Sequence, residues 1–359
     1  TTRVDPAGGI PFPSTPGVYG TLNNGPEFDT FVTRVNALGT AIQWSTFVGA
    51  ANIGFHTDQE SGYGIDVDES QGVWVCGATT NIFSGNFPLT PGAAQTLINN
   101  SNGDTDGFVY RLSPNGANLV YSTLLGGWNQ DFAFDIKVDA QQRAYVTGFA
   151  NSATLNDVTL DFLGMSNLGT VAEPTAVQVV NAAFAVRINP TGTQFLNATF
   201  IRTVPNPSPL NSTAVIGTAI AILPDPADST KTLTYVTGEV EADPIPAQGM
   251  AITPNAFQPV YGGNKDAFLV ALNDGFAAYT YVSYLGGSEY DIGRGIDVAA
   301  TGIVAITGST KITPPLSSPF PTKNALQISH GGGTDAFLTR FDPNQPTASN
   351  TVLSSSFLG

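Results

Sequence analysis

The sequence is poor in the residues that carry most enzyme chemistry and most covalent cross-links. It has one cysteine, two histidines and 11% charged residues, against the roughly 25% that is typical of soluble domains. The single cysteine, Cys76, excludes an internal disulfide, and its apolar surroundings in VWVCGAT indicate a buried core residue. Two histidines in unrelated loops, His56 and His330, do not predict a zinc or copper site.

Long apolar runs and basic clusters are also missing. No stretch of about 18 apolar residues occurs, so we expect no membrane insertion. The net charge of −15 leaves no basic stripe for phosphates, which excludes nucleic acid as a partner. Because no HExxH, GxSxG or P-loop motif is present, we expect no enzymatic activity. A carboxylate-based lyase or glycosidase stays open as a second alternative, since Asp residues are numerous although no pair stands out.

What the sequence does have is turn residues and a repeat. Gly occurs 39 times and Pro 25 times, which favours many turns over long helices. Self-comparison finds five similar segments, FVTRV, FVYRL, FAVRI, FLVAL and FLTRF, which begin at Phe31, Phe108, Phe184, Phe268 and Phe337. Each is followed by a second element such as LVYSTLLG. In most copies a third such as GIDVD (64–68) and a fourth such as AYVTG (144–148) come next.

We predict that these elements are β-strands grouped in fours. Each alternates apolar and polar residues over about five to eight positions, which is the period-2 pattern of strands. One four-stranded sheet cannot bury both its faces, whereas successive sheets packed around an axis can. We therefore predict an all-β fold, a β-propeller of four-stranded antiparallel blades, with four whole blades and an incomplete fifth.

We place the innermost strand of each blade at the GIDVD element. One domain then spans 1–359, with a half blade at 1–49 and blades at about 58–126, 127–202, 213–286 and 287–359. The half blade lacks its two inner strands, and three explanations stay open. The chain is part of a longer repeat protein, its N-terminal segment seals a five-bladed ring, or a neighbouring molecule supplies the missing strands, because an unpaired apolar edge is a template for another chain.

The repeat resembles a known family. The motifs DAFLTRFDPN, YSTLLGG, GYGIDVD and AYVTG, together with FPLTPGAAQ (87–95), resemble the bacterial and archaeal SBBP-type β-propeller repeat over nearly the whole chain. The resemblance implies a secreted or cell-surface protein. The third copy departs furthest, with Ala182 in place of the Asp that precedes the strand and AIAIL (219–223) in place of GIDVD, so we expect irregular turns there.

Acidic residues recur at fixed places in the repeat. Three of them, Glu60, Asp131 and Asp291, lie shortly before the inner strand, and four precede a strand Phe by two residues: Asp29, Asp106, Asp266 and Asp335. Oxygen ligands on Gly-rich loops suit calcium, whereas Asp in a turn also accepts backbone N–H groups. Calcium is the one cofactor that this pattern suggests. Its candidate ligands are Glu60, Asp131 and Asp291, with Asn102, Asp104 and Asp106 of NGDTDGF as the best single cluster.

Two further groups of side chains are aligned in the repeat. One position holds Arg34, Arg111, Arg187 and Arg340, and we expect each to pair with a carboxylate of its own or the next blade while its stem covers apolar surface. The second group, on the outer strands, comprises Trp44, Tyr121 and Tyr281. We expect these rings to pack between blades, with a carbohydrate-stacking platform as the alternative.

We expect a non-catalytic structural repeat protein that is secreted or lies at the cell surface. Its partners would be copies of itself or other surface proteins, joined into a filament or surface assembly by strand complementation. The alternative is a propeller module that binds glycans or proteins. Three N-x-[ST] sequons are candidate glycosylation sites, at Asn99, Asn197 and Asn211.

Overall fold

The structure, a computed structural model, is built almost entirely of short antiparallel strands. It describes residues 2–3, 12–21, 28–50, 59–80, 87–96, 105–127, 129–151, 181–203, 214–241, 249–312 and 319–359. The helices in these ranges are η3 (Asp274–Phe276) and α1 (Ala348–Thr351). Within the same ranges, no helix has the length and apolar character that a membrane crossing requires.

The strands form five sheets. The first sheet has three strands in the order β1-β2-β3, namely β1 (Thr2–Arg3), β2 (Phe28–Val35) and β3 (Ile42–Val48). Blade 1 comprises β4 (Glu60–Val67), β5 (Val73–Thr79), β6 (Asp106–Leu112) and β7 (Leu119–Leu125). Blade 2 comprises β8 (Asp131–Val138), β9 (Ala144–Ala150), β10 (Ala182–Ile188) and β11 (Phe195–Ile201).

Two more sheets complete the described fold. Blade 3 comprises β12 (Ala214–Asp225), β13 (Asp228–Glu241), β14 (Asp266–Leu272) and β15 (Tyr279–Leu285). Blade 4 comprises β16 (Asp291–Val298), β17 (Val304–Ile312), β18 (Gly333–Phe341) and β19 (Val352–Leu358). In each of these four blades the strands lie side by side in chain order, which confirms the predicted strand phase.

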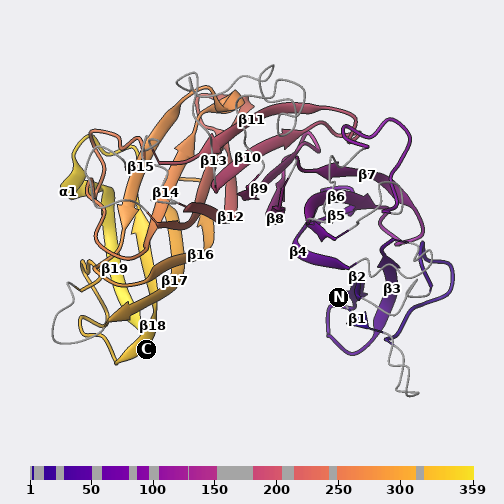
Figure 1. Cartoon of the computed structure of the whole chain (residues 1–359), viewed down its shortest axis with the longest axis horizontal. Helices are drawn as coiled ribbons and strands as arrows, with labels where there is room; N and C mark the ends of the chain where they lie inside the picture. The colour runs from indigo at the N-terminus through magenta and orange to yellow at the C-terminus, as the bar shows by residue number, and fades with distance from the viewer. Residues whose placement is uncertain are drawn as a thin grey trace.

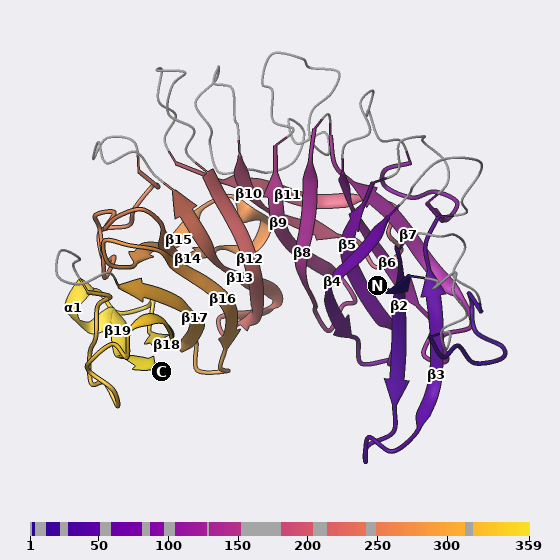
Figure 2. The same ribbon diagram turned by 60° about the horizontal axis from the view of Figure 1, so that its bottom comes forward.

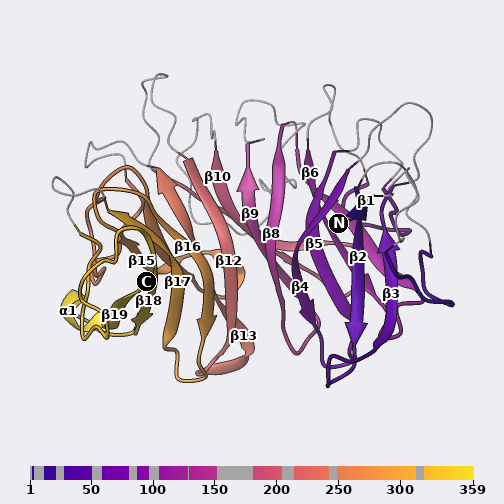
Figure 3. The ribbon, with the colours of Figure 1, turned by 90° about the horizontal axis from the view of Figure 1, so that it is seen from below.

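The sheets follow one another along an open arc. Figure 1 shows the first sheet at one end of the arc and blade 4 at the other, with the two chain termini beside them. The first strands of the four blades, β4, β8, β12 and β16, lie on the inner side of the arc, and Figures 2 and 3 show the sheets fanned around it. The chain is thus a β-propeller with four whole blades and an incomplete fifth, as predicted.

The core lies between sheets, in one apolar layer at each junction. At the first junction, Val32 and Trp44 of the first sheet pack with Val75 and Tyr110 of blade 1. Equivalent layers join blade 1 to blade 2, blade 2 to blade 3, and blade 3 to blade 4. Blades 1, 2 and 3 are therefore stabilised by burying both their faces against neighbouring sheets, the solution expected of sheets that cannot bury both faces alone, and blade 4 buries one face against blade 3.

A β-bulge recurs in every inner strand and explains a glycine in the repeat. In β4 the register shifts between Gly62 and Gly64, and the same shift occurs in β8, β12 and β16. The bulge brings a carbonyl oxygen against the second strand, so that a Cβ on Gly148 would lie 1.8 Å from the Phe132 oxygen. Gly77 faces the Ser61 oxygen in the same way, at 2.0 Å. Glycine therefore ends the AYVTG-type motif, at a position inside the strand, because a side chain there would collide with the bulge.

The copy that departs from the repeat keeps its strand pairing. Ala182, which replaces the Asp, pairs with Ala150 at the start of an unbroken ladder between β10 and β9. The AIAIL segment lies in β12, and the β12–β13 hairpin extends to a tip at Asp225 and Asp228. Its irregularity is therefore a longer hairpin, while most of the turn after Ile201 lies outside the described residues.

Candidate functional site

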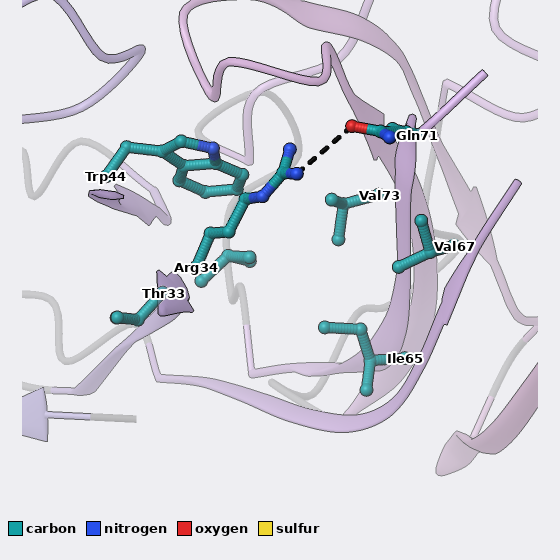
Figure 4. Close-up of a pocket in the computed structure, with 8 residues that line it drawn as sticks. Thr33, Arg34, Trp44, Ile65, Val67, Gln71 and Val73 are labelled. Atoms are coloured by element: carbon teal, nitrogen blue, oxygen red, sulfur yellow. Dashed lines mark hydrogen bonds between the residues drawn. The ribbon is translucent and has the colours of Figure 1, made fainter. Parts of the chain in front are cut away.

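The candidate site is a cavity between the first sheet and blade 1. Its volume is about 330 Å³, and its walls are Val32, Thr33, Arg34, Trp44, Ile65, Val67, Gln71 and Val73. Figure 4 shows Thr33, Arg34 and Trp44 on one side and Ile65, Val67 and Val73 on the other. We call this cavity, together with the adjoining edge of β2, the groove.

The groove exists because the first sheet has almost no second strand. The only described partner on this edge of β2 is β1, which pairs Thr2 with Asp29 and Arg3 with Phe28. In blade 1 the equivalent strand β6 pairs with β5 over its whole length, from Asp106 to Leu112. Along 30–35, β2 therefore has no paired strand on this edge within the part of the chain that the structure describes.

Apolar side chains of blade 1 are exposed beside this edge, where no strand of the described ranges covers them. Ile65 and Val67 of β4 are 56% and 55% exposed. Ile136 and Ile220, which hold the position of Ile65 in blades 2 and 3, are fully buried against the preceding blade. The exposure of Ile65 thus follows from the sheet in front of it and not from its own strand.

In blade 1 the corresponding space is filled by an aromatic ring of the second strand. The Trp74 ring lies 5.2 Å from the guanidinium carbon of Arg111 and 5.2 Å from the Tyr121 ring. In blade 2, Tyr145 takes the place of Trp74 and lies 5.9 Å from Arg187. Blades 1 and 2 therefore each stack an arginine of the third strand on a ring of the second strand.

A carboxylate at the residue directly after the inner strand completes this arrangement. Trp74 Nε1 donates a hydrogen bond to Asp68 Oδ2 at 2.7 Å, and Arg111 Nη2 lies 2.6 Å from the same oxygen. Burial by itself raises the pKa of Asp68, but hydrogen bonds from Ser70, Trp74 and Gly72 and the charge of Arg111 outweigh it and lower that pKa. In blade 2 the Tyr145 hydroxyl donates to Asp139 Oδ2 at 3.0 Å.

Arg34, at the equivalent place in the first sheet, has neither of these partners within the described ranges. Its guanidinium donates to Gln71 Oε1 at 3.1 Å and to the Pro114 carbonyl at 3.4 Å. The Trp44 indole donates to the same carbonyl at 3.0 Å. The expected pairing of the aligned arginines is found for Arg111 with Asp68 and for Arg187 with Asp274 of blade 3, at 2.6 Å each.

The predicted acidic residues lie in separate sheets and accept backbone N–H groups. Glu60 accepts from Ala50, Asp131 from Gly127 and Asp291 from Gly287. This is the turn role that the sequence offered as the alternative to calcium. The described residues hold no group of three or more potential metal ligands from His, Cys, Asp and Glu. Asp106 is fully buried, and its predicted co-ligands Asn102 and Asp104 lie outside the described residues, so calcium stays a prediction.

The remaining candidate residues are dispersed. Asn197 is half-buried on β11 and accepts a hydrogen bond from Arg187, whereas the sequons at Asn99 and Asn211 lie outside the described residues. The expected packing of the outer-strand rings is found, because a Cβ on Gly116 of the blade 1 turn would lie 2.6 Å from Trp44. The sequence repeat predicted which strands are missing, but not the cavity itself or the unmatched Arg34.

By its sheets and their order, the chain is a β-propeller repeat protein. No protein-family model and no curated protein sequence matches it. Among solved structures it is similar to a Dos1 propeller, with 7% identity and a TM-score of 0.28 over 90% of this chain and 72% of that one. It is also similar to BamB from Moraxella catarrhalis, with 10% identity and a TM-score of 0.25 over 90% and 89% of the two chains.

Proposed function

We propose that this protein is a non-catalytic structural repeat protein of the SBBP type, secreted or held at the cell surface. Its copies join end to end, and strands of one molecule complete the first sheet of the next. The observation that carries this proposal is that both ends of the arc leave uncovered the positions that the interior blades bury. Such edges and faces are templates for another chain.

Blade 4 supplies one of these two uncovered surfaces. Leu338 of β18 is 39% exposed, whereas Val109 and Leu269 at the same position in blades 1 and 3 are fully buried. Arg340 is exposed as well, while Arg111 at its position is paired with a buried carboxylate. The first sheet supplies the other surface, through the groove and the exposed Ile65.

Two further observations support a structural role outside the cell. The recurrent acids Glu60, Asp131 and Asp291 belong to three different sheets, and each accepts a backbone N–H group from the segment that precedes its strand. The net charge of −15 suits a surface that is kept soluble by acidic groups.

The test is the molar mass of the native protein by light scattering after size-exclusion chromatography, with intact mass on the same sample. We expect assemblies that are multiples of the 37.3 kDa chain. Leu338→Lys should dissociate them, because it places a charge in the joining face. Val120→Lys is the matched control, since Val120 is 46% exposed on β7, away from both ends of the arc. A monodisperse monomer of the unmodified chain would contradict the proposal.

A second candidate function is glycan or protein binding on the inner side of the arc. Tyr63 of β4 is 49% exposed and its ring lies 5.4 Å from that of Phe134, which is nearly parallel to Phe132 at 5.7 Å. Exposed rings of this kind stack on sugars and on apolar side chains. Titration of an oligosaccharide panel followed by NMR tests this function, and Tyr63→Ala should remove any binding that the unmodified chain shows.

A further inference from the structure

We infer that the groove binds a β-hairpin of the type that this repeat uses as its own inner strand pair, donated by another polypeptide. The hairpin places an aromatic side chain against Arg34 and a carboxylate beside it. This inference rests on the proposed function, because it takes the first sheet as a joining surface. It specifies which side chains the donated strands must contain.

The register of the first sheet defines where the hairpin lies. β1 pairs Thr2 with Asp29, just as Thr79 of β5 pairs with Asp106 in blade 1. Strand β1 thus occupies only the end of the second-strand position that lies beside Phe28 and Asp29. The rest of that edge, residues 30–35 of β2, corresponds to the length of β6 that pairs with residues 73–78 of β5. Because Thr1 precedes β1 in this antiparallel pair, a donated strand of five residues along 31–35 fits without displacing β1.

The cavity and its cation indicate an aromatic residue in this strand. In blades 1 and 2 the second strand presents Trp74 or Tyr145 to the third-strand arginine. The ring also packs on the outer-strand aromatic, as Trp74 does on Tyr121. The groove contains the two side chains that would contact such a ring, Arg34 and Trp44, and they line a cavity of about 330 Å³. A ring in this space would regain a cation–π contact and bury apolar surface.

The charge at the groove indicates that a hairpin binds and not a single strand. Where the inner strand is present, the Asp68 carboxylate directly after it accepts a hydrogen bond from the ring and pairs with Arg111. Arg34 has only the neutral acceptors Gln71 and Pro114 among the described residues. An inner strand with Asp at this place would supply the missing negative charge, and it would cover the exposed Ile65 and Val67.

The probe is a synthetic peptide with the sequence of residues 131–150, DFAFDIKVDAQQRAYVTGFA, which forms the β8–β9 hairpin with Asp139 and Tyr145. A fluorescein-labelled form is titrated with the full chain, and binding is followed by fluorescence anisotropy. We expect saturable binding that the peptide variants Tyr145→Ala and Asp139→Asn each weaken about tenfold, the effect of roughly 1.4 kcal/mol from a lost ring or charge contact.

Substitutions in the protein locate the bound peptide. Arg34→Gln should weaken binding about tenfold, whereas Arg294→Gln, the same change at an exposed arginine of β16, should leave it unchanged. Ile65→Glu should abolish binding, and since Ile65 is exposed this variant keeps its fold. Absence of saturable binding overturns the inference. So does equal binding to the Arg34→Gln and Arg294→Gln proteins.

Failure of this inference can be told apart from failure of the proposed function. If the protein is a monomer that binds the peptide through Arg34, the groove is a strand-binding site but the end-to-end assembly is wrong. If the protein assembles and excess peptide neither binds nor dissociates the assemblies, the copies join by other surfaces and the inference is wrong.

Discussion

The junction between blades 1 and 2 and the junction between the first sheet and blade 1 use the same kinds of strands, but only the former is closed. Ile136 and Ile65 hold equivalent positions, and they are 0% and 56% exposed. Arg111 stacks on a ring, whereas Arg34 donates hydrogen bonds to two neutral acceptors. Whether a side chain is buried at these junctions therefore depends on the neighbouring sheet. A given position of the repeat can lie in the core at one junction and on the surface at the next.

The largest expected difference between the two junctions is the cost of removing an apolar side chain. Ile136→Ala should lower the free energy of unfolding by about 2–5 kcal/mol, because it leaves a cavity in a packed layer. Ile65→Ala should change it by less than about 0.5 kcal/mol. Chemical denaturation of both variants measures this, and equal losses would show that the groove is closed in solution.

The arginines should differ nearly as much. Arg111→Gln leaves the Asp68 carboxylate buried without its cation, and we expect a loss of about 3 kcal/mol. Arg34→Gln removes only hydrogen bonds to neutral groups at a half-exposed site, so the loss should stay below about 1 kcal/mol. Thermal unfolding of the two variants gives the comparison. A large loss for Arg34→Gln would reveal a partner that fills the groove.

The repeated glycine should matter only where a bulged inner strand faces it. Gly148→Ala should destabilise the protein by about 2 kcal/mol, because its Cβ would lie 1.8 Å from the Phe132 oxygen. Gly62→Ala is the control, since its Cβ would meet nothing closer than 3.6 Å. If both variants unfold at the same denaturant concentration, the bulge adapts to a side chain and the repeat glycine has another cause.

The last expected difference is a pH dependence at the closed junction between blades 3 and 4. Burial, aided by the charge of Asp291, raises the pKa of Asp266 to about 7 against hydrogen bonds from Gly262 and Gln258. Because an unfolded Asp titrates near 3.9, the folded state holds a proton that the unfolded state has lost between pH of about 4 and 7. Stability should therefore fall as the pH rises through this window.

Asp266→Asn imitates the protonated form and should reduce that slope by up to one proton, about 1.4 kcal/mol per pH unit. The matched control is Asp228→Asn at the tip of the β12–β13 hairpin. Hydrogen bonds from Thr230 and Lys231 lower the pKa of Asp228 to about 2, so its titration lies outside the window. Denaturant unfolding at several pH values measures both variants. An unchanged slope for Asp266→Asn would show that other groups carry the pH dependence.

Much of the fold could be predicted from the sequence because each type of strand occurs several times along the chain. The FVYRL-type and AYVTG-type segments fix the strands, and the position of GIDVD identified the innermost strand and the half-empty first sheet. The two-residue strand β1 was not predicted, since Thr2 and Arg3 are too few to show a periodic pattern. The bulge was not predicted either, because it shows only as a register shift between Gly62 and Gly64.

The candidate site was predicted in part. The unpaired edge of the half blade follows from counting strands, but the cavity does not. Ile65 in GIDVD and Ile136 in DIKVD hold the same place in the repeat, and so do Arg34 and Arg111, so the repeat pattern does not distinguish a covered residue from an uncovered one. The difference is made by strands that lie far away along the chain.

Each complete blade takes its four strands from one continuous stretch of chain, laid down in order from the inner to the outer edge. No strand is shared between blades 1 to 4. Recombination that duplicates or deletes a whole repeat in the coding sequence would therefore leave every remaining sheet intact. Such events would change the number of blades in the arc, and with it the length of the arc, by whole repeats.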